Sequence, residues 1–346
     1  MSALPPVNIN RLLTTLDQLL RIDSPTGDTS AMEQDITRRL SSFGWKVSQT
    51  HRGNVLAQSG DDPKRVIAAH LDTLGAMVQF IREDGRLEVT PLGTWSARFA
   101  EGGRATVKTR QGPIRASLLP LLSSGHAWNE AVDTQPVAWS QLSARLDRPT
   151  ASREETLALG VQPGDIVCID PVPEFDDSGY ITSRFLDNKA GIACVLEMLH
   201  LLQENKLTPE QPVLLAFTNA EEIGLGAGTA LPRSIEELIS VDIAPVARNQ
   251  ASREDCATLG YKDALAPHSR TLLDRLDNMA TDHEIEFVRD VFRYYHSDCS
   301  STLTAGYDAS TALVGFGTDS THGYERTHQK SLTAVTQMLI GYVLSN

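Results

Sequence analysis

Short apolar runs that lead straight into polar residues are the feature that most limits how this chain can fold. Residues 66–69 run into His70, and residues 213–217 are followed closely by Glu221 and Glu222. Runs this short and apolar are typical of strands buried on both faces of a parallel sheet. Stretches with apolar residues at helical spacing separate them. The alternation predicts an α/β fold, with a mainly parallel sheet flanked by helices.

The expected helices and strands lie in the two ends of the chain. Helical spacing of apolar residues predicts helices over residues 8–22, 29–43, 191–202, 269–284 and 332–344. Apolar runs predict strands at residues 45–47, 54–57, 66–69, 213–217, 235–241 and 312–315.

The middle of the chain has a different sequence pattern. Between about residues 75 and 170, short alternating segments are separated by Gly and Pro turns, which predicts a small β-sandwich or β-barrel. We therefore expect residues 1–74 and 171–346 to form one catalytic α/β domain, into which residues 75–170 are inserted as a β domain.

Composition excludes several classes of function. The 346 residues carry a formal charge of −13, whereas a nucleic-acid-binding protein usually shows a basic patch. The four cysteines form no CxxC pair, which argues against a zinc ribbon or a disulfide framework and fits the cytoplasm. The sequence contains no run of about 18 apolar residues and no signal peptide, so a membrane, like nucleic acid, is not an expected partner.

Polar residues next to the predicted strands are the candidates for chemistry. His70 and Asp72 follow one strand, Glu221 and Glu222 follow another, and Asp187 begins a predicted helix. Each has an ordinary explanation when taken alone: a hydrogen-bonded histidine, a solvated loop or a helix cap. The glutamate pair can also divide its work, with one binding a metal and the other serving as general base.

Two further segments extend the pattern. Asp242 ends the apolar run at residues 238–241, and a cluster at residues 321–328 contains His322 and His328. Either histidine could bind a metal through a neutral imidazole.

The joint pattern is more informative than any of its members. His70, Asp187, Glu222, Asp242 and His322 mostly lie near predicted strand ends, which a parallel sheet gathers along one edge. Oxygen and nitrogen ligands without thiolate suit zinc, cobalt or manganese. Five ligands, one of them able to bridge, predict two divalent metal ions per chain rather than one.

At this point the sequence resembles metallopeptidase family 42, the group of glutamyl and tetrahedral aminopeptidases. The resemblance covers nearly the whole chain, including the insert. Its motifs are AHLDTLG at residues 69–75, VQPGD at 161–165, RFLDNKAG at 184–191, TNAEEIG at 218–224 and VDIAP at 241–245.

The resemblance implies a role for each ligand candidate. His70 and Asp242 would hold one metal ion, while Glu222 and a C-terminal histidine would hold the other. Asp187 would bridge the two ions. The family usually reads Arg-Tyr-x-His-Ser at the last ligand, whereas the segment of this chain that aligns there reads DSTHGYE, at residues 319–325. An ungapped alignment favours His322 there, with His328 as the alternative.

The resemblance also implies roles for the acids beside the metals. Glu221 would be the general base, and Asp72 would orient His70 and fix its tautomer. In the family the inserted domain mediates assembly, often into twelve subunits, so a homo-oligomer up to a dodecamer is implied. His126 in the insert is either a surface residue or one that a neighbouring subunit projects toward the site.

Three functions remain open at this stage. The leading one is an aminopeptidase that hydrolyses the first amide bond of a peptide or small dipeptide. The altered loop at residues 319–325 resembles a branch linked to bacterial osmoprotectant dipeptide metabolism, so a deacylase or amidohydrolase acting on a small N-acyl dipeptide is the second. A catalytically silent binding scaffold is the third, although all the ligand candidates and Glu221 are intact.

Overall fold

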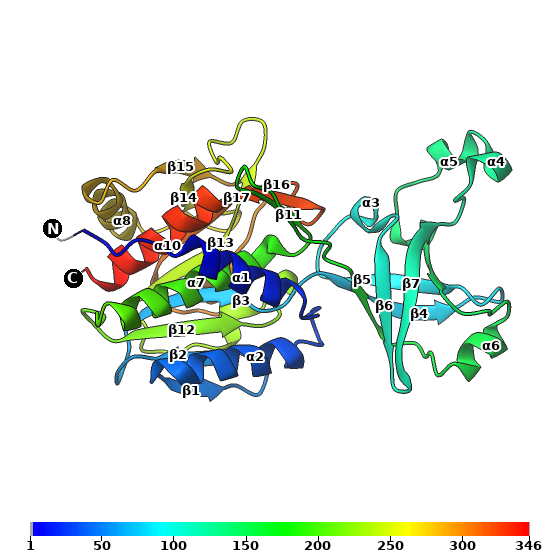
Figure 1. The fold of residues 1–346 in the computed structure, drawn as a ribbon, viewed down its shortest axis with the longest axis horizontal. Helices are drawn as coiled ribbons and strands as arrows, with labels where there is room; N and C mark the ends of the chain where they lie inside the picture. The colour runs from blue at the N-terminus through cyan, green and yellow to red at the C-terminus, as the bar shows by residue number, and fades with distance from the viewer. Residues whose placement is uncertain (1–2, 346) are drawn as a thin grey trace. The chain divides into compact units, whose positions relative to one another are not determined.

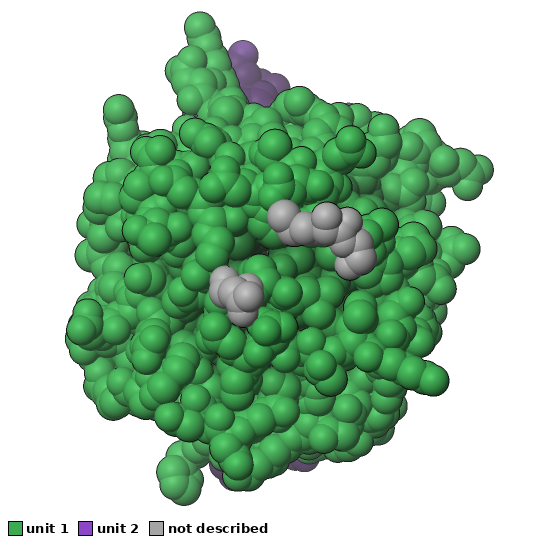
Figure 2. Space-filling model, turned by 90° about the vertical axis from the view of Figure 1, so that its left-hand side faces the viewer, with its two compact units in different colours: residues 1–72, 172–346 green, residues 73–171 purple. Residues whose placement is uncertain are grey.

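The computed structural model describes residues 3–345 and divides into two compact units. Met1–Asp72 and Val172–Asn346 form unit 1, and Thr73–Pro171 form unit 2 (Figures 1 and 2). The predicted boundaries, after residues 74 and 170, lie one or two residues from these. Each unit is described by itself.

Unit 1 is built on one eleven-stranded sheet with the order β1-β2-β12-β3-β13-β16-β17-β11-β10, to which β14 and β15 are joined beside β16. Its strands are β1 (Lys46–Gln49), β2 (Val55–Gln58), β3 (Arg65–His70), β10 (Glu174–Phe175), β11 (Tyr180–Ser183), β12 (Val213–Thr218), β13 (Glu237–Val246), β14 (Ala257–Lys262), β15 (Phe287–Val291), β16 (Ser310–Asp319) and β17 (Glu325–His328). The central strands β12, β3, β13 and β16 are parallel, while both ends of this strand order are antiparallel. The α/β prediction is confirmed, with a sheet that is mixed rather than mainly parallel.

Helices cover the sheet unequally. Ile67 and Ala69 of β3 belong to the large apolar core beneath α1, α2, α7, α8 and α10, whereas Val66 and Ala68 face a smaller core beneath α9 and the 3₁₀ turn η4 (Figure 1). These elements are α1 (Ile9–Leu20), α2 (Ser30–Leu40) with η1 (Ser41–Phe43), α7 (Leu186–Glu204), η3 (Glu221–Ile223), η4 (Gly226–Thr229), α8 (Arg270–Asp282), α9 (Asp298–Thr304) and α10 (Gln329–Val343). Both faces of β3 are buried because its side chains alternate between the two cores.

α7 begins five residues earlier than the apolar pattern predicts. Its first turn contains Asp187 and Asn188, whose backbone angles are not helical and whose shared peptide bond is cis. Phe185, just before the helix, has a left-handed φ of 67°. A pattern of apolar spacing does not detect this turn, because its residues are buried for reasons other than hydrophobicity.

Unit 2 is a closed barrel with the strand order β4-β5-β8-β7-β6-β9. Its elements are β4 (Gly75–Ile81), β5 (Leu87–Leu92), α3 (Ala97–Ala100), β6 (Arg104–Thr109), β7 (Gly112–Pro120), α4 (Gly125–Trp128), α5 (Ala131–Thr134), η2 (Trp139–Gln141), β8 (Leu142–Leu146), α6 (Arg153–Ala158) and β9 (Ile166–Ile169). Pairing of Ala76 with Val167 closes the barrel. The insert is thus a barrel rather than a sandwich, with four short helices that the sequence did not predict. His126 lies on α4 and is exposed.

In the part of the chain that the structure describes, no helix combines the length and the apolar character needed to span a bilayer.

Candidate metal centre

The ends of β3 and β13 bring two predicted ligands together. β3 ends at His70, and its parallel pairing with β13 extends to Ala68 opposite Ser240. Two residues further along, Asp242 is level with His70 and on the same face of the sheet. The prediction that Asp242 ends a strand is wrong, because β13 continues to Val246 alongside β16. The two side chains meet where β13 and β3 stop pairing.

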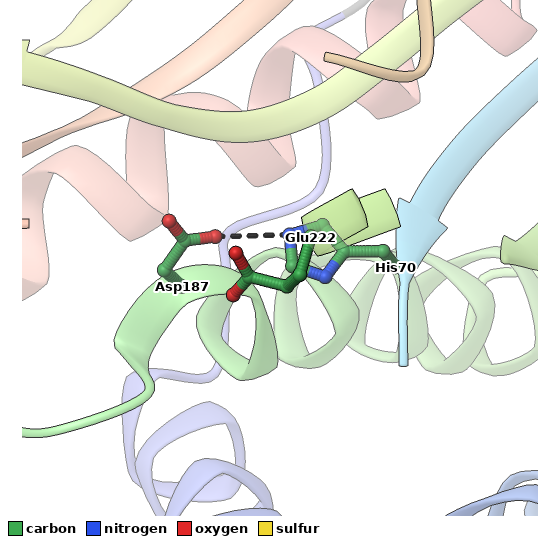
Figure 3. Close-up of side chains that lie close together, drawn as sticks. All are labelled: His70, Asp187 and Glu222. Carbon is green, nitrogen blue, oxygen red and sulfur yellow. Dashed lines mark hydrogen bonds and ion pairs between the residues drawn. The ribbon is translucent and has the colours of Figure 1, made fainter. Parts of the chain in front are cut away.

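The hydrogen bonds of His70 fix how its ring is used. Nδ1 lies 2.9 Å from the carbonyl oxygen of Asp72, which can only accept, so Nδ1 carries a proton. Nε2 therefore faces the carboxylates. It lies 2.9 Å from Asp187 Oδ1 (Figure 3). It also lies 3.9 Å from both Glu221 Oε2 and Asp242 Oδ1. A nitrogen surrounded by acceptors needs either a second proton or a metal ion.

Asp187 presents one carboxylate oxygen to each of two histidines. Oδ1 faces His70, and Oδ2 lies 3.5 Å from His322 Nε2. His322 Nε2 is also 3.5 Å from Glu222 Oε2. One possible ligand atom each from His70, Asp187 and Glu222 lies within 4.8 Å of the others. Asp187 thus stands between a group made by His70 and Asp242 and a group made by His322 and Glu222.

His328 is engaged elsewhere. Its Nδ1 accepts the backbone N–H of Lys330 at 3.1 Å, which caps α10, and its Nε2 lies 3.0 Å from the carbonyl oxygen of Ser178. Its ring packs edge-on against Tyr180. Of the two histidines in this segment, only His322 faces the acidic cluster.

Three carboxyl groups of the cluster, those of Glu221, Glu222 and Asp242, resist ionisation. Burial raises the pKa of Glu222 to about 8. Burial likewise raises the pKa values of Glu221 and Asp242 well above the ordinary carboxyl range, and neighbouring carboxylates add to the effect. Like charges held this close together favour either protonation or a bound cation.

The histidines, by contrast, are held in their charged form. Burial alone would lower their pKa values, but the hydrogen bonds to Asp187 and the charges of the surrounding carboxylates together outweigh it. The pKa of His70 lies well above its ordinary value, and that of His322 rises to about 10. Although burial opposes ionisation of Asp187, the bonds from His322 and His70 hold its pKa below the ordinary value.

One buried oxygen of the cluster lacks a protein partner. Glu222 Oε1 accepts no hydrogen bond from any residue between 3 and 345, and leaving a buried carboxylate oxygen unpaired is costly. Carboxylate oxygens and imidazole nitrogens, with no thiolate among them, are the ligands that zinc, cobalt and manganese accept. The side chains present therefore fit divalent metal ions.

Asp72 contacts this cluster through both its backbone and its side chain. Its carbonyl oxygen, rather than its carboxylate, orients His70, since the nearest carboxylate oxygen is 3.7 Å from Nδ1. The carboxylate instead accepts the backbone N–H of Glu221 at 3.0 Å, the N–H of Glu222 at 3.4 Å and the Thr26 hydroxyl at 2.6 Å. Asp72 thereby ties the end of β3 to the η3 turn.

Sequence reasoning missed several residues around the site. Thr26 lies between the helices predicted over residues 8–22 and 29–43. Asp298 on α9 accepts the Thr218 hydroxyl at 2.7 Å and the backbone N–H of Ala227 at 2.6 Å, and so holds the end of β12 to η4. Burial and the nearby charge of Asp242 raise the pKa of Tyr295 well above its ordinary value. No local pattern marks these residues, because only the tertiary fold brings them to the cluster.

Known proteins share both the sequence pattern and the fold. The family model described as M42 glutamyl aminopeptidase matches residues 53–338. The chain is 32% identical over 342 residues to the Bacillus subtilis (strain 168) protein named "Putative aminopeptidase YhfE", covering 98% of this chain and 99% of that one. It is 26% identical over 245 residues to the glutamyl aminopeptidase of Lactococcus lactis, covering 68% and 67% of the two chains.

Solved structures share the fold at lower identity. The TET aminopeptidase of a marine sediment archaeon superposes with a TM-score of 0.87 at 17% identity, over 97% of both chains. The TET1 peptidase of Pyrococcus horikoshii gives 0.86 at 20% identity, over 97% of this chain and all of that one.

The α/β unit with its inserted barrel and its buried cluster of histidines and acids defines the class of metal-dependent aminopeptidases. Within that class, the chain belongs to the M42 glutamyl aminopeptidase family.

Proposed function

We propose that this chain is a two-metal aminopeptidase that releases the N-terminal residue of peptides or of a small dipeptide. His70 and Asp242 would hold one ion, and Glu222 and His322 the other, with Asp187 between them. The observation that carries the proposal is the position of Asp187, whose two oxygens each face a different histidine. A carboxylate used in this way is what a bridging ligand requires.

The protein supplies the proton transfer. When bound, the ions would act as Lewis acids that polarise the scissile carbonyl and acidify a water molecule. Glu221 would accept the proton of that water and deliver it to the leaving amine. Support for this role comes from its raised pKa, its side chain only 12% exposed and its position 3.9 Å from His70. Asp72 would hold Glu221 in place through the backbone N–H bond.

The metal stoichiometry tests the proposal. Elemental analysis of gently purified protein should find about two zinc, cobalt or manganese ions per chain, and Glu222→Ala and His322→Ala should each lose one. The protein with its metal ions bound should hydrolyse peptides that have a free N-terminus, but it should not hydrolyse N-acyl dipeptides. No bound metal after reconstitution would contradict the proposal and favour a silent scaffold, whereas activity on N-acyl dipeptides alone would favour a deacylase.

We also propose that unit 2 mediates assembly into a homo-oligomer in the cytoplasm. The TET1 peptidase of Pyrococcus horikoshii assembles into a tetrahedron or a large octahedral shell, and a related structure is a dodecamer. Four free and buried cysteines support a reducing compartment. Light scattering coupled to gel filtration should give a mass several times that of one chain, and a monomer would contradict the assembly.

A further inference from the structure

The loop that carries His322 has a backbone conformation that needs support. It joins β16 to β17, and two of its residues other than glycine are left-handed: Ser320 has φ 55° and His322 itself has φ 64°. The backbone N–H of Gly323 closes the turn on the carbonyl oxygen of Ser320 at 2.9 Å. Left-handed residues with a side chain are disfavoured unless the surroundings hold them. The direction of the His322 ring therefore depends on what fixes this loop.

Glu325 provides that support from inside the protein. Its carboxylate belongs to a residue that is only 1% exposed. Oε1 accepts the backbone N–H of His322 at 3.0 Å, and Oε2 accepts the backbone N–H of Asp187 at 3.0 Å. The Thr321 hydroxyl lies 3.2 Å from both Glu325 Oε1 and Asp187 Oδ2. One carboxylate thus joins two metal-ligand candidates that are far apart in the sequence.

We propose that Glu325 is a positioning residue that sets the distance and direction between Asp187 and His322. It thereby determines how tightly the second metal ion, the one held by Glu222 and His322, binds. This inference rests on the proposed two-metal function. Glu325 does this through the backbone of both residues, without contacting an ion itself. Hydrogen bonds from backbone N–H groups to a carboxylate are among the stronger ones in proteins.

An amide in place of this carboxylate cannot do the same work. Both oxygens of Glu325 accept a backbone N–H, whereas glutamine offers one oxygen and one NH₂ group. In Glu325→Gln, the N–H of either Asp187 or His322 must therefore face a donor. The buried volume is unchanged, so the substitution removes the acceptor without creating a cavity.

Binding of Co²⁺ to the metal-free protein tests the inference. Titrations followed by calorimetry and by the visible absorption of Co²⁺ should show two ions in the natural protein. In Glu325→Gln one ion, the one held by Glu222 and His322, should bind about 10- to 100-fold less tightly, as is usual when a group behind a metal ligand is changed, and the other ion should bind normally. The absorption spectrum of the second ion should change as well.

Glu197→Gln is the matched control. Glu197 is another buried glutamate of unit 1, also 1% exposed, whose carboxylate accepts from Arg11 and from the backbone N–H of Asn8. Losing this carboxylate should leave both Co²⁺ affinities unchanged. If Glu325→Gln fails to fold, Thr321→Val provides a second variant. It removes the hydroxyl that lies between Glu325 Oε1 and Asp187 Oδ2, and it should weaken binding of the ion at Glu222 and His322 by about fivefold.

The outcomes separate the two proposals. Normal binding of both ions by Glu325→Gln, or by Thr321→Val where the first variant does not fold, would overturn the positioning role alone. An equal loss of Co²⁺ affinity in Glu197→Gln would also overturn it, because the weaker binding would then follow from removing any buried carboxylate of unit 1. If the natural protein binds fewer than two ions, the two-metal function fails and this inference fails with it.

Discussion

Glu221 and Glu222 are neighbours in the sequence, yet they face different partners. Glu222 Oε2 lies 3.5 Å from His322 Nε2, whereas Glu221 Oε2 lies 3.9 Å from His70 Nε2. The first position suits a ligand and the second a proton acceptor. Adjacent residues can divide the work in this way because the η3 turn that holds them sends their side chains to different partners.

Replacing Glu221 should separate chemistry from metal binding. We expect Glu221→Gln to lower kcat by about 10²- to 10⁴-fold, because a general base contributes about that much, while both ions stay bound. Glu222→Gln, the matched change one residue away, should lose an ion as well as activity. Steady-state kinetics with elemental analysis of the same samples checks both expectations. Full activity in Glu221→Gln would assign the proton transfer to another residue.

His328 allows a test of which histidine serves the site. His328→Ala removes the side-chain acceptor at the start of α10 and should lower the free energy of unfolding by about 1 kcal/mol. It should leave the metal content and kcat unchanged, since both ring nitrogens contact backbone groups away from the cluster. Chemical denaturation and metal analysis, run beside His322→Ala, give the answer. Loss of an ion in His328→Ala would reverse the assignment.

At the level of elements, the sequence predicts what depends on local apolar pattern. The short runs at residues 66–69 and 213–217 correspond to β3 and β12, and the helix over residues 8–22 corresponds to α1. Leu12, Leu16, Leu19 and Leu20 of α1 are all buried, as their spacing requires. Patterns of this kind are visible because each depends on residues a few positions apart.

The elements that were missed depend on distant partners. β17 and α9 have no apolar periodicity of their own, and Asp242 lies within a strand whose second half pairs only with β16. The apolar run at residues 238–241 predicts a strand that ends at Asp242, whereas β13 continues to Val246 and Asp242 lies beside His70 where the pairing with β3 stops. The site residues could be found from the sequence as a set, whereas Asp298 and Thr26 could not.

A network of charged residues lies at the amino-terminal ends of β3 and β13, and its contribution to stability should depend on pH. Glu237 begins β13 and binds Arg275 of α8, the Tyr342 hydroxyl of α10 at 3.0 Å and Arg65 of β3 at 3.5 Å. Burial would raise the pKa of Glu237, but the hydrogen bond from Arg275 and the charges of both arginines outweigh it, so its pKa is lowered.

The sign of the pH effect follows from this lowered pKa. Glu237 stabilises the fold above the carboxyl pKa of the unfolded chain, and that stability is lost as the pH falls through the lower folded value. Glu237→Gln should therefore cost about 1–2 kcal/mol at pH 7 and progressively less toward pH 3. Denaturation curves across this pH range, with exposed Glu236→Gln as the control, measure the difference. A cost that stays constant with pH would contradict the ionic role of Glu237.

For the whole molecule, the two units should respond differently to metal. All five proposed ligands and Glu221 belong to unit 1, and the barrel of unit 2 contributes none of them. An ion that binds the folded unit but not the unfolded chain stabilises that unit by mass action. The two halves of the chain that flank the insert meet at this cluster, since His70 comes before the insert and the other ligands come after it. Metal binding should therefore hold together the two segments of the chain that form unit 1.

Removing the metal should test this coupling directly. At a free ion concentration 100 times the Kd, each site adds about 2.7 kcal/mol to the stability of unit 1. Chelation should thus lower the Tm of unit 1 by several degrees, and added Zn²⁺ should restore it. His322→Ala should show a smaller shift, because only the ion held by His70 and Asp242 remains. Calorimetry that resolves the two units should place the change in unit 1, and a shift confined to the barrel would show that the metal binds outside the proposed cluster.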